Sequence, residues 1–229
     1  MASSFGGFRR EDFEGIAGTT WRGRDGFGGH VTQLLNRDER EDRFQSWALY
    51  GRQEIHIAYE RDYKKREPIH SAKLFVYTSG ERLAYGMYVE CDPDNAARWV
   101  HWQKLRDDPE AHERLRQLLR TTDLKVARFA EAEEEDERRN HDPVWGFRSN
   151  SGNLLYKEDA REDDRTERPV KFEDLVREIR DLPVTKWVDL HIFSEMEQGR
   201  AISLKGAVAK EVYKVLNALI PAYRKLLEK

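Results

Sequence analysis

Asp189, Ser203 and Lys205 follow the order of a metal-dependent phosphodiester-cleaving site, with one substitution. Such a site binds Mg²⁺ through two carboxylates on adjacent strands, and a lysine follows closely after the second carboxylate. Serine stands here at the second carboxylate position. We expect Glu195 and Glu197 to lie in a turn, where they are poorly placed to replace it. The sequence therefore assigns no catalytic residue and no metal ligand, and a divergent nuclease of the PD-(D/E)xK kind stays as an alternative.

Other motifs of catalytic chemistry are missing from the sequence. It contains no GxxxxGK[ST] phosphate loop, no GxSxG nucleophile turn and no HExxH zinc motif. Its one cysteine, Cys91, has no partner for a disulfide or a CxxC zinc site, and is interpreted as a small apolar residue. We therefore predict no cofactor, and favour a binding function over an enzymatic one.

Composition and charge limit the classes of protein to which the chain could belong. Of its 229 residues, 36% are charged and 38% are hydrophobic, which still permits a core. The formal net charge is −3, so any binding to nucleic acid would need a local basic cluster. There is no signal-peptide pattern and no run of apolar residues long enough to span a bilayer. We predict a cytoplasmic protein with no membrane partner.

The hydrophobic patterns predict an α+β fold: a mixed, mostly antiparallel sheet with helices packed on it. In the segment "QEIHIAYERD", alternation places His56 on the solvent side. Pro221 is expected to kink or break the last helix. Strands are predicted over 44–51, 53–62, 72–79, 82–91 and 185–193, with a hairpin over 142–159 that turns at 149–153. Helices are predicted within 29–44, 96–103, 109–119, 122–140, 171–182 and 207–229.

The domain organisation follows from the same patterns. Residues 1–30 are rich in glycine and aromatic residues and are interpreted as an irregular arm. Residues 31–229 are predicted to form a single α+β domain. Within it we expect a helical insert around 103–140 and an exposed, charged loop over 160–169.

The stretch from "FQSWALYG" through the hairpin "KLFVYTS"–"RLAYGMYV" to "AARW" resembles the N-terminal domain of McrBC-type modification-dependent restriction systems. The specific part covers residues 44–102, and a weaker likeness lies in "WVDLHIF", "GRAI" and "LNALIPAYRKLL". The chain departs from the family in its long insert over 103–168. It also has charged "NRDERED" where some members carry a Gly-Tyr-Gly stretch.

The resemblance implies a non-catalytic reader of double-stranded DNA in a prokaryotic antiviral defence system. Such a domain flips a modified cytosine into an aromatic pocket, and a separate GTPase or nuclease subunit or domain does the chemistry. Flipping costs a few kcal/mol of unstacking, which aromatic faces and hydrogen bonds to the base edge repay. Which modification is read does not follow from the residues.

Trp47 is the one residue that the resemblance carries over, as a wall of the pocket. The aromatic residues that we place around this pocket are Trp47, Tyr50, Tyr85 and Trp21. The basic residues that we place on the DNA backbone are Arg22, Arg24, Arg52, Arg61, Lys64, Lys65 and Arg66. For each aromatic residue the alternative is a place in the core, and for the basic loop it is a solubilising role.

The strand 82–91 and the helix after it complete this hypothesis. Alternation places Leu83, Tyr85 and Met87 on one face of the strand, and Ala84 and Gly86 on the other. We expect these two small residues to leave room for a planar base against Trp47. Trp99 and Trp102 are three residues apart and are predicted to cover the sheet as core. A protein-interaction or small-ligand sensor without a DNA role, which the negative net charge favours, is the remaining alternative.

Overall fold

The computed structural model describes residues 5–14, 21–22, 26–38, 43–48, 53–61, 72–91, 96–129, 143–157, 167–182 and 188–228. The strands are β1 (Phe44–Ala48), β2 (Glu54–Tyr59), β3 (Ala72–Ser79), β4 (Arg82–Cys91), β5 (Lys125–Phe129), β6 (Pro143–Asn150), β7 (Asn153–Lys157), β8 (Arg168–Val170) and β9 (Val188–Glu197). The helices are η1 (Arg10–Asp12), α1 (Phe27–Asp38), α3 (Ala96–Asp107), α4 (Pro109–Thr121), α5 (Phe172–Arg180), α6 (Gln198–Ser203), η3 (Lys205–Ala207) and α7 (Val208–Leu227).

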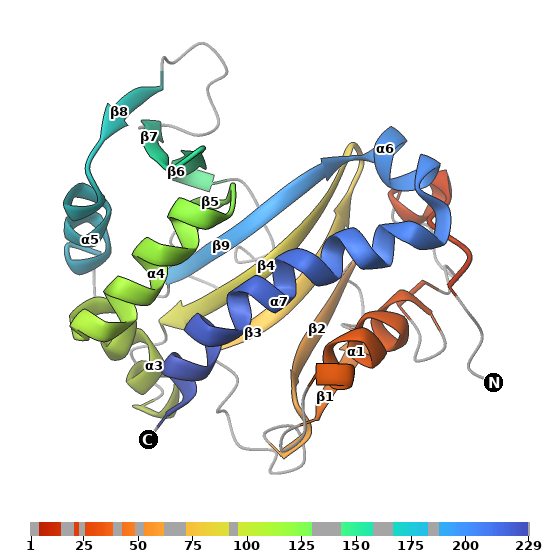
Figure 1. Cartoon of the computed structure of the whole chain (residues 1–229), viewed down its shortest axis with the longest axis horizontal. Coiled ribbons are helices and arrows are strands. Elements are labelled where there is room, and N and C mark those ends of the chain that lie inside the picture. The colour runs from red at the N-terminus through yellow and green to blue at the C-terminus, as the bar shows by residue number, and fades with distance from the viewer. Residues whose placement is uncertain are drawn as a thin grey trace. The chain divides into compact units, whose positions relative to one another are not determined.

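The predicted α+β class is confirmed. In the described part of the chain, nine strands form a sheet in the order β1-β2-β3-β4-β9-β5-β6-β7-β8, with helices packed on it (Figure 1). The chain divides into two compact units: unit 1 holds residues 1–86 and 194–217, and unit 2 holds 87–193 and 218–229. No helix in the described ranges is long and apolar enough to cross a bilayer.

Unit 1 is built around β1, β2 and β3, which pair antiparallel in a register that sets Trp47 opposite His56, and His56 opposite Phe75. Helix α1 lies beside β1 (Figure 1). The two come close because residue 28 is glycine: a Cβ there would lie 2.8 Å from the Ser46 hydroxyl oxygen. The helix predicted within 29–44 is thus confirmed, although it begins at Phe27, inside the predicted arm.

The described part of residues 1–30 contributes an aromatic cluster to the core of unit 1. Phe8 lies at the centre of the cluster, with its ring centroid 4.8 Å from that of Phe27 and 5.4 Å from that of Trp21. Phe13 and Phe5 complete the cluster at its edges. Phe8, Phe13, Trp21 and Phe27 are all buried, so the segment packs although its described residues before α1 are irregular apart from η1.

Two glycines let the N-terminal segment lie directly against the backbone that precedes α7. Gly7 has φ +124°, and a Cβ on it would lie 2.6 Å from the Lys205 Cα. A Cβ on Gly206 would lie 2.7 Å from the carbonyl oxygen of Phe5. Neither distance is open to a side chain, so the contact between these two backbone segments requires glycine on both.

Unit 2 contains strands β5 to β8 and helices α3, α4 and α5, and the start of α4 follows from local chemistry. Asp108 caps α4 by accepting a hydrogen bond from the Glu110 amide at 2.8 Å, and Pro109 takes the first helical position, as predicted. Leu115, Leu118 and Leu119 form the buried stripe of α4, and Trp102 of α3 is fully buried. The side chain of Trp99 lies outside the described residues.

Three predictions about single elements are wrong, and a fourth is corrected in part. The helix predicted over 122–140 is replaced by strand β5 in its described part, where β5 pairs with β6 and β9. Helix α7 continues through Pro221, so the break that was expected there as the alternative to a kink is absent (Figure 1). Glu195 and Glu197 lie on β9 and not in a turn. His56 is not solvent-facing, because only 3% of it is exposed.

The hairpin of β6 and β7 is confirmed, and its turn makes a prediction. Ser151 and Gly152 both have positive φ, 51° and 83°, between the paired residues Asn150 and Asn153, which is the geometry that favours Asn-Gly. Ser151→Asn should therefore raise the free energy of unfolding by up to about 1 kcal/mol. Gly152→Ala should lower it by about 1–2 kcal/mol through the left-handed backbone alone, because an added Cβ meets nothing closer than 3.9 Å.

Urea unfolding of the two variants checks the turn. The hypothesis on the turn fails if Gly152→Ala matches the original chain, or if Ser151→Asn is the less stable of the two variants.

Candidate functional site

The aromatic residues predicted for a pocket have different environments. Trp21 is 2% exposed, sits in the aromatic cluster and donates its Nε1–H to the Gln53 side-chain oxygen at 3.4 Å. Tyr85 on β4 is 4% exposed. Trp47 on β1 is only half-buried, and Tyr50 lies outside the described residues. Among the pocket candidates that the structure describes, Trp47 alone is a half-buried residue and not a buried one.

The structure does not bring Trp47 and Tyr85 together. Strands β2 and β3 lie between β1 and β4 in the sheet. Neighbouring strands are about 4.8 Å apart, so β1 and β4 are separated by roughly 14 Å. Burial raises the pKa of the Tyr85 hydroxyl, against the opposing effect of its hydrogen bond with Ser194. Trp47 therefore does not face Ala84 and Gly86 directly, as the sequence hypothesis required.

Trp47 instead lies against a buried polar pair that the sequence reasoning missed. Its ring meets the His56 ring edge to face, with centroids 5.7 Å apart and planes at 86°. His56 Nε2 is 2.9 Å from Glu54 Oε1, and each of the two residues is 3% exposed. Glu54 and His56 are two apart on β2 and so share a face. The spacing was visible in the sequence, but the polarity of both residues suggested a solvent-facing side.

The basic residues predicted for the DNA backbone lie mostly outside the described ranges: Arg24, Arg52, Lys64, Lys65 and Arg66. Arg22 is half-buried beside Trp21. Arg61 is exposed directly after β2, with its guanidinium carbon 5.2 Å from the centroid of the Tyr59 ring. Whether these residues form one basic patch stays a prediction.

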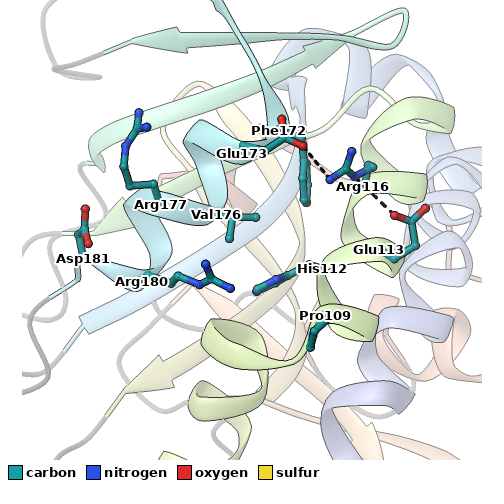
Figure 2. Close-up of a pocket in the computed structure, with 10 residues that line it drawn as sticks. All are labelled: Pro109, His112, Glu113, Arg116, Phe172, Glu173, Val176, Arg177, Arg180 and Asp181. Carbon is teal, nitrogen blue, oxygen red and sulfur yellow. Dashed lines mark hydrogen bonds and ion pairs between the residues drawn. The ribbon is translucent and has the colours of Figure 1, made fainter.

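A second candidate site is a groove of about 460 Å³ in unit 2, between α4 and α5 (Figure 2). Three arginines line it: Arg116 from α4, and Arg177 and Arg180 from α5. Its other lining residues are Pro109, His112, Glu113, Phe172, Glu173, Val176 and Asp181. No motif marked these residues in the sequence, because α4 and α5 are far apart along the chain.

Arg116 is held in one orientation at the upper end of the groove (Figure 2). Its Nη2 is 2.9 Å from Glu173 Oε1, its Nε is 3.5 Å from Glu113 Oε2, and its guanidinium lies 4.6 Å from the centroid of the Phe172 ring. The pKa of Glu173 is lowered, first by a hydrogen bond from its own backbone amide and then by Arg116. Glu173 is therefore ionised at neutral pH and orients Arg116.

The lower part of the groove contains Arg180 and His112, whose side chains point toward one another in Figure 2. Arg180 donates its Nε–H to the carbonyl oxygen of Arg106 at 3.4 Å. His112 Nε2 is 2.8 Å from the carbonyl oxygen of Leu105, which can only accept, so Nε2 carries the proton. Arg177 is paired with Asp174 at 2.6 Å.

Ser203 and Lys205 do not lie where the nuclease alternative requires them, which is on a strand next to that of Asp189. Ser203 ends α6 and Lys205 begins η3, so this Ser-x-Lys segment is not on a strand. Glu195 is 3.1 Å from the Arg82 guanidinium. Within the described residues, no group of three or more His, Cys, Asp or Glu side chains could hold a metal ion.

The remaining source of evidence on function is similarity to other proteins. The chain matches no protein-family model, no curated protein and no solved structure. The resemblance of residues 44–102 to restriction systems stays a prediction, and the evidence on function consists of the side chains and their geometry.

Proposed function

We propose that this chain is a DNA-reading module that takes a modified cytosine against Trp47, with no catalysis of its own. The observation that carries the proposal is the half-buried ring of Trp47 on β1, which stands edge to face on His56. The resemblance of residues 44–102 supports the same assignment, and it also implies a GTPase or nuclease partner that acts once DNA is bound.

The chemistry of the groups around Trp47 suits a flipped base. Stacking of a base on an aromatic ring contributes about 1–3 kcal/mol, and it tolerates any base because every base has a π face. The carboxylate of Glu54 is a group that accepts hydrogen bonds from the exocyclic amine of cytosine. His56, in contact with both Trp47 and Glu54, would hold the carboxylate and the ring in fixed relative positions.

Replacing Trp47 with alanine should abolish the preference for modified DNA. The measurement is fluorescence anisotropy of two labelled duplexes that differ only in one 5-methylcytosine. The lost stacking corresponds to roughly 5- to 150-fold weaker binding of the modified duplex. Trp47→Phe should keep most of the preference, because it keeps an aromatic face. The half-buried position of Trp47 on β1 also leads us to expect an unchanged melting temperature within a few degrees.

Gln45→Ala is the matched control, because Gln45 is half-buried and shares with Trp47 one face of β1. It should bind both duplexes as the original chain does. The proposal is wrong if the original chain binds neither duplex, or if Trp47→Ala discriminates between them as well as Gln45→Ala.

A further inference from the structure

We infer that the groove between α4 and α5 is a track for the phosphodiester backbone of nucleic acid, a second contact in addition to the base site. The inference rests on the proposed function, since it takes DNA to be the ligand. The track continues from the groove of Figure 2 into a neighbouring hollow of about 280 Å³, because Arg116, Phe172 and Glu173 line both.

The charges along this track favour an anion. Five cationic side chains line the two hollows: Arg116, Arg120, Lys171, Arg177 and Arg180. Three carboxylates also line the two hollows: Glu113, Glu173 and Asp181. Asp174, which pairs with Arg177 beside the groove, is a fourth, so the track has an excess of one positive charge on a chain whose formal net charge is −3. A local excess of this kind attracts polyanions even when the whole chain is acidic.

Three of the five cations form no ion pair with a carboxylate among the described residues, while Asp107 acts on Arg180 and Glu173 on Lys171 at longer range. Arg180 is held through its Nε by the uncharged carbonyl of Arg106. Arg120 and Lys171 are exposed. The carboxylates of Glu113 and Glu173 are both paired with Arg116 and orient that guanidinium, and Lys171 acts on Glu173 only at longer range.

The distribution of the cations distinguishes a chain of phosphates from a single small anion. A small anion would require cationic groups that converge on one point. Here the cations come from α4, α5 and the residue before α5, and they are spread over two connected hollows. Guanidinium groups are suited to phosphate oxygens because their planar fork can donate two parallel hydrogen bonds.

The test is the salt dependence of binding to an unmodified and a modified duplex. We compare the original chain with Lys171→Ala, Arg180→Ala and the double variant, and use Arg114→Ala as the control. Arg114 is an exposed arginine on α4 that does not line the track. Each lost phosphate contact should reduce the slope of log affinity against log salt by about 0.9. When salt rises from 50 to 200 mM, each phosphate contact weakens the binding of the original chain by roughly 3.5-fold. A variant that lacks one contact should lose that much less affinity over the same range.

Both duplexes should be affected equally by the track variants, because backbone contacts carry no base information. The track is overturned if Lys171→Ala and Arg180→Ala behave like Arg114→Ala while the original chain still prefers modified DNA; the base site then stands. The track is also overturned if Lys171→Ala and Arg180→Ala weaken the binding of polyglutamate and leave the binding of DNA unchanged. The groove would then be a site for acidic peptides. If the original chain binds no duplex, both proposals fall. Reduced slopes with an unchanged preference in Trp47→Ala would uphold the track and remove the base site.

Discussion

Replacing Trp102 with alanine is expected to lower the free energy of unfolding by about 3–5 kcal/mol, which is the range for a fully buried large aromatic residue. Trp102 is 0% exposed in α3. Its Nε1–H is buried and forms no hydrogen bond with a described residue. The ring therefore contributes through volume and apolar contact, and its loss leaves a cavity that the helix cannot close without moving.

Two further variants make the Trp102 prediction specific. Gln103→Ala changes the exposed neighbour on the same helix and should stay within about 0.5 kcal/mol of the original chain. Trp102→Phe should fall between the two, because it keeps most of the apolar ring and removes a buried donor that has no acceptor among the described residues. Equal denaturant midpoints for Trp102→Ala and Gln103→Ala would show that Trp102 is not part of the core.

Gly7→Ala should also be strongly destabilising, for two additive reasons. Alanine at φ +124° is strained by about 1–3 kcal/mol. The new Cβ would lie 2.6 Å from the backbone of Lys205, and an overpacked contact of this kind costs about 1–3 kcal/mol more. Because Gly7 directly precedes Phe8, the strain should loosen the aromatic cluster and change the fluorescence of Trp21.

Gly6 provides the matched control for Gly7. A Cβ on Gly6 would meet no atom within 4 Å. Gly6→Ala should therefore unfold at the same guanidinium concentration as the original chain. Gly206→Ala tests the other side of the contact and should resemble Gly7→Ala, because its Cβ would lie 2.7 Å from the Phe5 carbonyl oxygen. If Gly7→Ala and Gly6→Ala are equally stable, the N-terminal segment does not pack on residues 205–206.

Elements that depend on neighbouring residues were predictable from the sequence. Asp108 and Pro109 mark the start of α4, since a cap and a first-turn proline act within a few residues. The β3–β4 and β6–β7 hairpins follow from short turns between strands with alternating residues. The helix predicted within 207–229 was also correct as α7, and Val208, Val212 and Leu216 on it are buried in unit 1.

Elements that depend on distant partners were mispredicted. The segment of β5 reads as a helix because it leads into a run of helix-forming residues, but pairing with β6 and β9 makes it a strand. The polar residues Glu54 and His56 suggested an exposed face of β2, but they are buried as a hydrogen-bonded pair. Strand pairing and burial in the sheet therefore outweigh local propensity and the polarity of single residues.

By itself the sequence determined the α+β class and most element positions, which follow from hydrophobic period, caps and turns that act over a few residues. Trp47 became a candidate for base recognition only through the resemblance of residues 44–102, and that role stays a prediction. Only the tertiary structure decided which side chains meet: His56 against Trp47, and Glu173 of α5 against Arg116 of α4. These pairs lie on different elements, and their contact depends on strand register and on helix packing, which no short stretch of sequence encodes.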